Sequence, residues 1–246
     1  MNIPNNIIKS MFQNVYFIIG TAYAGKSTAV KLLAEIFDGI CCGENYHDIF
    51  MKHIDKEHQL NLSYFDTMKD WQEFISRTPD EYAAWIDGCS KEAESLEIIR
   101  LFQLISEDKI IFVDTNISLE TLREISDYQH IAVMLCPQSM SVDRFFDRSD
   151  PEKRFILDQI NQADNPEKAM MNYRKCLENI NSKEVYERYA NSGFYTIVRN
   201  DTSTIENTLQ KLIEHFGLKL KRGNINAQLE SYTIREIHKR QNTACY

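Results

Sequence analysis

The chain has 246 residues, of which 43% are hydrophobic, and its net charge is −8 from 28 basic and 36 acidic side chains. This excess of acid argues against broad electrostatic binding to nucleic acid. With only 8 glycines and 5 prolines, the composition excludes collagen-like and low-complexity chains and argues against an all-β fold, which needs many tight turns.

The cysteines and the apolar runs indicate in which cellular compartment the protein is expected. None of the six cysteines forms a CxxC pair or a cysteine–histidine cluster with zinc spacing, so we expect reduced thiols. The longest apolar runs, at 15–19 and 131–136, are far shorter than the ~20 residues that span a bilayer. With no recognisable N-terminal signal, the sequence predicts a cytoplasmic protein with neither a membrane nor a nucleic-acid partner.

Short apolar runs alternate with helical patterns along the chain. Strands are expected at 15–19, 40–43, 110–113, 131–136 and 194–198. Helices with apolar residues at helical spacing are expected at 26–37, 118–126 and 201–216. This alternation predicts an α/β fold, in which right-handed crossovers build a five-stranded parallel sheet with helices on both faces.

Two helical stretches are too long for simple crossovers, and we expect them to be insertions. One covers 46–108, after the second strand, and the other covers 138–191, between the fourth and fifth strands. The predicted organisation is one domain over 1–217, followed by a tail over 218–246 that adds one helix at most.

The first insertion contains clear local signals. Thr78-Pro79 is a strong helix start. Asp87-Gly88 is expected to interrupt a helix. Trp71 and Trp85 are expected to pack inside this lobe, and stacking on a base is the alternative.

The strongest motif is Gly20-Thr-Ala-Tyr-Ala-Gly25-Lys26-Ser27, which fits GxxxxGK[ST] between a predicted strand and a predicted helix. The glycines let backbone N–H groups turn toward an oxyanion, and the helix N-terminus adds partial positive charge. Lys26 is expected to reach the β- and γ-phosphates and Ser27 to bind Mg²⁺. The pattern predicts ATP with Mg²⁺, bound by Gly20, Thr21, Ala22, Tyr23, Ala24, Gly25, Lys26, Ser27 and Thr28.

This loop, and the order of elements from about 14 to 216, resemble the P-loop kinases of small molecules, including nucleoside-monophosphate kinases and shikimate- and gluconate-kinase-like enzymes. The resemblance implies an acceptor-binding lobe after the second strand and a mobile lid between the fourth and fifth. Both insertions occupy those places. Tyr23 departs from the family, which often has glycine there. A tyrosine predicts a loop without positive φ at this position, and its ring is a candidate contact for the acceptor.

The strand at 110–113 ends in Asp114, like a Walker B element, whose carboxylate holds Mg²⁺ directly or through water. We therefore predict Asp114 as a metal ligand beside Ser27. The alternative is that Asp114 caps the turn through Thr115 and Asn116.

The segment from Gly43 to Asp48 follows the second strand, at the edge of the sheet where ligands gather in parallel folds. Glu44 and Asp48 are candidates for orienting or deprotonating the acceptor hydroxyl, and Glu44 is favoured because it is nearest to the strand end. Tyr46 and His47 are candidate acceptor contacts. The competing interpretations are a helix cap for Asp48 and solvent exposure for Glu44 and His47.

Arginines in the second insertion are candidates for the lid. Arg144 and Arg148 are four residues apart and are expected on one helical face, with Arg154 following. In the resembling kinases, lid arginines neutralise charge on the transferred group, and a planar guanidinium suits phosphate oxygens. We predict catalytic roles for Arg144 and Arg148 and substrate binding for Arg154. Surface ion pairs with neighbouring acids are the alternative.

The loop Arg199-Asn200-Asp201 follows the last predicted strand. The resemblance places this loop beside the adenine, where it makes mainly backbone contacts. A helix cap by Asp201 or Thr202 is the competing interpretation.

These features predict an ATP-dependent phosphotransferase that moves the γ-phosphoryl group to a small-molecule hydroxyl or phosphate. A nucleoside or deoxynucleoside kinase is one alternative, although Asp114-Thr-Asn stands where such enzymes carry an arginine-bearing segment. A regulatory nucleotide binder with slow hydrolysis is another, and no NKxD motif indicates guanine binding. The sequence names neither the acceptor nor an oligomeric state.

Overall fold

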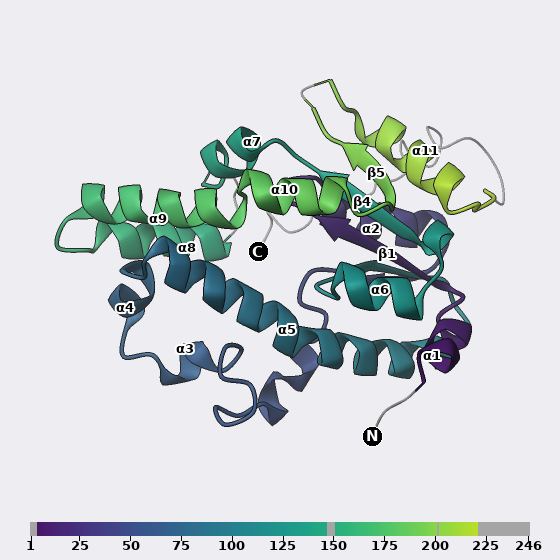
Figure 1. The fold of residues 1–246 in the computed structure, drawn as a ribbon, viewed down its shortest axis with the longest axis horizontal. Helices are drawn as coiled ribbons and strands as arrows, with labels where there is room; N and C mark the ends of the chain where they lie inside the picture. Colours follow the sequence, from purple (N-terminus) through teal and green to yellow (C-terminus); the bar gives the residue numbers. More distant parts are fainter. Residues whose placement is uncertain (1–3, 147–150, 201, 221–246) are drawn as a thin grey trace, which may run out of the picture.

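The computed structural model describes residues 4–146, 151–200 and 202–220 (Figure 1). Arg148, Asp201 and the helix considered for the tail lie outside the described residues. Within the described ranges, no helix is both long enough and apolar enough to cross a membrane.

Five parallel strands form one sheet in the order β2-β3-β1-β4-β5. The strands are β1 (Val15–Gly20), β2 (Ile40–Cys42), β3 (Ile111–Asp114), β4 (Ile131–Leu135) and β5 (Tyr195–Val198). Ile18 is paired with Asp114 and Gly20 with Met134, so the carboxyl ends of β1, β3 and β4 meet at one edge. The sheet confirms the predicted α/β fold class.

Helices cover both faces of the sheet, which gives three layers (Figure 1). One face carries α2 (Lys26–Ile36) and α11 (Ile205–His215), whose buried leucines include Leu33 and Leu209. The helices on the other face are α1 (Asn5–Met11), α5 (Pro79–Leu104), α6 (Leu119–Ile125) and α10 (Lys183–Ala190). Because both faces are covered, β3 and β4 are buried at successive positions and, apart from Asp114 at the end of β3, are apolar, as is typical of parallel sheets.

The two insertions pack together as a helical lobe beside the sheet (Figure 1). Its helices, besides the N-terminal half of α5, are α3 (Tyr64–Thr67), α4 (Trp71–Ile75), α7 (Gln138–Asp143), α8 (Pro151–Asn161) and α9 (Pro166–Ile180). Short 3-10 helices occur at η1 (Asp48–His53), η2 (Ile105–Glu107) and η3 (Tyr128–His130). A separate core containing Phe74, Ile160 and Tyr173 joins the two insertions, with Trp71 and Trp85 packed against it.

Helix α5 begins as expected and then runs further than expected. Thr78 and Glu81 form a capping box and Pro79 occupies the first turn. The predicted interruption at Asp87-Gly88 is wrong, because α5 is continuous to Leu104. A Cβ on Gly88 would lie 2.4 Å from the Asn61 amide group, so this glycine lets the preceding loop approach the helix rather than ending it.

Candidate active site

The loop of residues 20–25 joins β1 to α2 at the carboxyl edge of the sheet. Gly20 has φ 139°, and a Cβ there would lie 1.9 Å from the Met134 carbonyl oxygen, so only glycine fits against β4. Gly25, at φ 94°, precedes α2, and no side chain of the described residues caps this helix start. The first amides of α2 lack acceptors within the helix and carry the positive end of its dipole, which suits an anion.

Tyr23 adopts φ 64°, so the prediction of a loop without positive φ at this position is wrong. Two contacts explain how a tyrosine holds a conformation that costs about 1–2 kcal/mol. The Tyr23 hydroxyl donates to the main-chain oxygen of Arg144, and the Tyr23 carbonyl accepts from Arg199 Nη1 at 2.6 Å. The Lys153 ammonium also lies 5.6 Å from the centre of the ring. Contact between this ring and an acceptor stays a prediction.

Further hydrogen bonds fasten the loop to β4 and α7. The Thr21 amide donates to the Met134 oxygen at 3.1 Å, and Thr21 Oγ1 accepts from the Cys136 amide at 2.8 Å. Ser141 Oγ donates to the Ala22 oxygen at 3.0 Å. The loop is therefore positioned by its neighbours before any ligand arrives.

Lys26, Ser27 and Asp114 meet where the loop enters α2. Ser27 Oγ donates to Asp114 Oδ2 at 2.7 Å, and Lys26 Nζ lies 3.8 Å from Asp114 Oδ1 and donates to the Thr21 oxygen at 3.2 Å. Asp114 is only 4% exposed. Burial raises the pKa of Asp114, while the Lys26 charge and the Ser27 hydrogen bond work in the opposite direction.

The oxygen atoms of Ser27 and Asp114 fit the ligand preference of Mg²⁺, a hard cation that takes oxygen ligands. Among the described residues, no group of three or more histidine, cysteine, aspartate or glutamate side chains has a metal-binding arrangement. A magnesium ion at this pair would therefore complete its shell with phosphate and water oxygens, as is usual for this ion.

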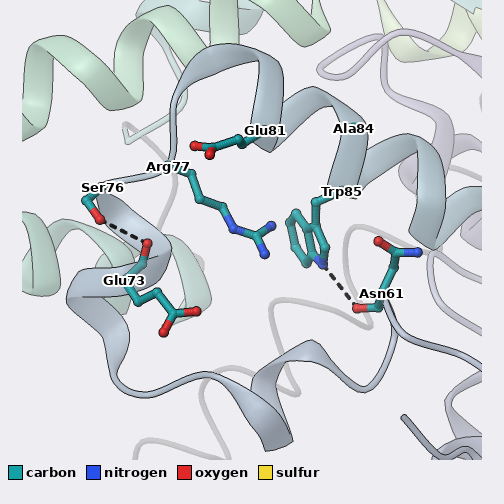
Figure 2. A pocket seen from close by; sticks show the side chains of 7 residues that line it. All are labelled: Asn61, Glu73, Ser76, Arg77, Glu81, Ala84 and Trp85. Carbon is teal, nitrogen blue, oxygen red and sulfur yellow. Dashed lines mark hydrogen bonds between the residues drawn. The ribbon is translucent and has the colours of Figure 1, made fainter. Parts of the chain in front are cut away.

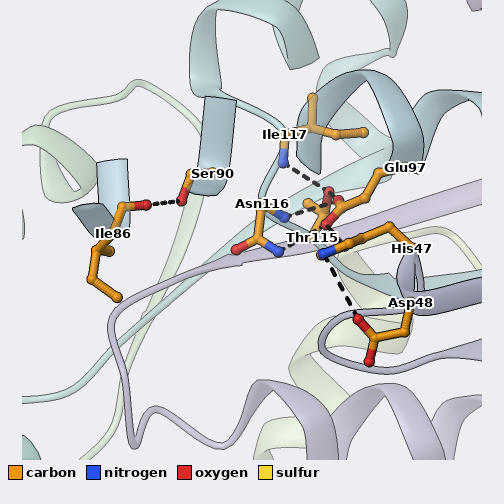
Figure 3. Close-up of polar contacts among 8 residues, drawn as sticks. All are labelled: His47, Asp48, Ile86, Ser90, Glu97, Thr115, Asn116 and Ile117. Atoms are coloured by element: carbon orange, nitrogen blue, oxygen red, sulfur yellow. Dashed lines mark hydrogen bonds and ion pairs between the residues drawn. The ribbon is translucent and has the colours of Figure 1, made fainter. Parts of the chain in front are cut away.

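A buried carboxylate, Glu97 of α5, is bonded to the residues that follow β3 (Figure 3). Its side chain is fully buried and accepts hydrogen bonds from Thr115 Oγ1 at 2.7 Å, Asn116 Nδ2 at 2.7 Å and the Asn116 amide at 3.0 Å. His47 Nδ1 lies 3.2 Å from Glu97 Oε1. Glu97 was not among the residues predicted for the site. Its one signal is a place between Ala93 and Leu101, at four-residue spacing, on the buried stripe of α5.

The acceptor-side candidates separate into buried and exposed groups. His47 is 3% exposed, so the interpretation of His47 as a solvent-exposed residue is wrong, and its Nε2 lies 4.0 Å from Asp48 Oδ1 (Figure 3). Asp48 and Glu44 are exposed, and the Glu44 charge acts to raise the pKa of Asp114. Tyr46 is partly buried, and its pKa is raised by burial and by the Glu97 charge. Their contacts with an acceptor stay predictions.

The structure describes two of the three predicted lid arginines. Helix α7 ends at Asp143, and Arg144 is its C-terminal capping residue. Because Arg148 lies outside the described residues, the expected shared face of Arg144 and Arg148 stays a prediction. The main-chain oxygen of Arg144 accepts from Tyr23, which ties this helix end to the loop. Arg154 is exposed in the first turns of α8. Asp143, one of the neighbouring acids in the alternative of surface ion pairs, pairs with Arg174.

Arg199 follows β5 and reaches the loop with its side chain. Its amide donates to the Leu135 oxygen at 2.8 Å, and its guanidinium donates to the Tyr23 oxygen and lies beside Gly25. For this segment the resemblance implied mainly backbone contacts, and no contact between the Arg199 side chain and the loop was predicted. Helix α11 is capped by Thr204, not by Thr202. The structure thus brings the Arg199 guanidinium to the loop, in addition to the ammonium groups of Lys26 and Lys153.

Comparisons with known proteins found no match to this chain. No family model matches the chain, no curated protein matches it, and no solved structure matches it. The functional assignment therefore depends on the side chains described above.

Proposed function

We propose that this protein is an ATP-dependent phosphotransferase, which moves the γ-phosphoryl group of ATP to a hydroxyl or phosphate of a small molecule. The observation that carries the proposal is the meeting of Lys26, Ser27 and Asp114 at the start of α2, behind a loop fixed by Gly20. This combination supplies main-chain amides, a cation and two oxygen ligands at one point, which is what a magnesium–nucleotide complex requires.

In this proposal, the amides of the loop hold the phosphates and Lys26 neutralises the oxygens of the β- and γ-phosphates. Ser27 and Asp114 would hold Mg²⁺, which neutralises charge on the phosphates when bound. Lys26 Nζ now donates to the Thr21 oxygen and lies near Asp114. We expect nucleotide binding to exchange these contacts for contacts with phosphate.

The acceptor would lie beside Glu44 and Asp48, which are exposed after β2. Phosphoryl transfer passes through a loose transition state, so orienting the acceptor hydroxyl matters more than removing its proton early. The contacts with Glu97 hold the side chains of His47 and Asn116 in place, and His47 directly precedes Asp48. The Arg199 guanidinium donates to the loop, and Arg144 and Arg154 remain candidates for charge neutralisation.

A coupled assay for ADP release tests the proposal. We expect slow basal turnover that rises sharply when one member of a panel of nucleosides, nucleotides, sugars and hydroxy acids is added. Lys26→Ala should lose at least about 100-fold in kcat/KM, because it removes charge stabilisation of the transition state. Lys31→Ala, an exposed lysine on the same helix, is the matched control and should retain activity.

Three results separate the proposal from the alternatives. Stimulation by nucleosides alone would identify a nucleoside kinase. Slow hydrolysis that no acceptor stimulates would favour a regulatory nucleotide binder. Full activity in a folded Lys26→Ala variant would contradict the site itself.

A further inference from the structure

A second feature of the molecule is a cavity of about 540 Å³ in the helical lobe (Figure 2). It is lined by Asn61, Glu73, Ser76, Arg77, Glu81, Ala84 and Trp85. Trp85 and Glu97 both belong to α5 and are twelve residues apart, which at 1.5 Å per residue is about 18 Å along the helix. One small molecule cannot reach both places, so this cavity is distinct from the site at the sheet edge.

Arg77 projects into this cavity and is held by aromatic rings (Figure 2). Its Cζ lies 3.8 Å from the centre of the Tyr64 ring and 5.3 Å from that of Trp85. Among the described residues, no carboxylate oxygen lies within 4.0 Å of the guanidinium, and the buried Nη1 has no hydrogen-bond partner. Because no described carboxylate pairs with the guanidinium, its charge is available to an anionic group of a ligand. The planar guanidinium is suited to a carboxylate.

Two carboxylates, Glu73 and Glu81, line the same cavity. A backbone hydrogen bond from Lys69 is the main cause that lowers the pKa of Glu73, and one from Thr78 does so for Glu81, so both are ionised at neutral pH. Glu81 Oε2 accepts from the Thr78 amide and hydroxyl, whereas Glu81 Oε1 has no hydrogen-bond partner among the described residues. Two negative charges near one guanidinium disfavour a doubly charged anion and favour a ligand that also carries a positive group.

We propose that this cavity binds a small zwitterion, with its carboxylate on Arg77 and its ammonium on Glu81. Trp85 supplies an apolar wall whose position is fixed, because its Nε1 donates to the Asn61 oxygen at 3.0 Å (Figure 2). The simplest ligand of this class is a free α-amino acid. The proposal is independent of the phosphotransferase activity, since it uses none of the residues at the sheet edge.

Tryptophan fluorescence provides a direct binding test. The chain has two tryptophans, so the full-length Trp71→Phe variant reports on Trp85 alone. We would titrate it with each of the standard amino acids, and with inorganic phosphate, succinate and butylamine, and confirm hits by calorimetry on the unaltered chain. We expect saturable binding of at least one amino acid and none of the three simpler ions. No saturation by any amino acid up to about 10 mM, or equal affinity for phosphate or succinate, would overturn the proposal.

Variants at the cavity test the assigned contacts. Arg77→Met keeps the apolar stem and should weaken amino-acid binding at least tenfold, about 1.4 kcal/mol. Arg100→Met, at an arginine of α5 that bonds to Gln103, is the matched control and should bind normally. Glu81→Gln, which preserves the helix cap, should also weaken binding. Lys26→Ala should not, which separates this site from the nucleotide site.

A second variant at Arg77 keeps the test possible if the first one does not fold. If circular dichroism shows that Arg77→Met does not fold, Arg77→Lys replaces it, because it keeps the charge and loses the fork of donors. Unchanged affinity in a folded Arg77 variant and in Glu81→Gln would overturn the proposal, whatever the phosphotransferase assay shows.

Discussion

The sheet edge and the cavity of the helical lobe hold their charged side chains in opposite ways. At the edge, Lys26 and Asp114 are held by each other and by polar atoms of the loop. In the lobe, Arg77 is held by the faces of aromatic rings. Polar contacts fix the position of a charged group but occupy its hydrogen-bonding atoms. Stacking on a ring face leaves the N–H groups at the edge of a guanidinium available to a ligand.

The backbones of the two regions differ as well. The loop depends on positive φ at Gly20, Tyr23 and Gly25, each of which restricts the residue that can stand there. The residues that line the cavity come from α4, α5 and the segments before and between them, and none of them has positive φ. We therefore expect substitutions that alter the backbone to be damaging at the edge, and the lobe to respond to changes of charge.

The largest expected effect is that of Gly20→Ala. Its Cβ would collide with the backbone of Met134, which cannot move without distorting β4. We expect a loss of at least about 4 kcal/mol in the free energy of unfolding, measured by urea denaturation. Gly43→Ala is the control, because no described atom lies within 4 Å of the added methyl group. Similar stability of the two variants would contradict the close packing of the loop on β4.

Asp114→Asn should separate stability from activity. In the proposed function it removes a ligand of Mg²⁺, so kcat/KM should fall by about 100-fold. Because burial raises the pKa of Asp114, this carboxyl stabilises the fold less as pH rises from its unfolded pKa through its folded pKa. The variant should lose that pH dependence and melt at a higher temperature than the unaltered protein at pH 8, in the absence of Mg²⁺. A lower Tm would show that the contacts with Lys26 and Ser27 outweigh the desolvation of the carboxylate.

Glu97→Gln tests the buried hydrogen bonds around the Glu97 carboxylate. A glutamine side chain offers one acceptor oxygen in place of two, so at least one of the donors on His47, Thr115 and Asn116 loses its partner. The expected loss is about 2 kcal/mol, or about 4–8 °C in Tm. Glu107→Gln, at an exposed glutamate just beyond α5, is the matched control. Equal melting temperatures would mean that the four contacts of Glu97 add nothing to stability.

The sequence predicts the sheet better than it predicts the site. The five strands lie within two residues of their expected ends, because each is a short run of mostly apolar residues, and the central strands β1, β3 and β4 are buried on both faces. The meeting of Ser27 and Asp114 follows from a motif with fixed spacing. Glu97 and Arg77 have no such spacing, since their partners come from other elements through tertiary packing. The prediction for Tyr23 φ was wrong for a related reason, because contacts with residues distant in the sequence override the backbone preference of tyrosine.

Tyr23→Phe has the smallest expected effect and tests whether the loop depends on the Tyr23 hydroxyl. The variant keeps the ring and the carbonyl that accepts from Arg199, and it removes the donor to the Arg144 oxygen. We expect a loss of about 1 kcal/mol or less, and a KM for ATP that rises by no more than about fivefold. Tyr128→Phe, at an exposed tyrosine, is the control. An unchanged acceptor KM in both Tyr23→Phe and Tyr23→Ala would exclude an acceptor contact, and leave Tyr23 as a link between the loop and the end of α7.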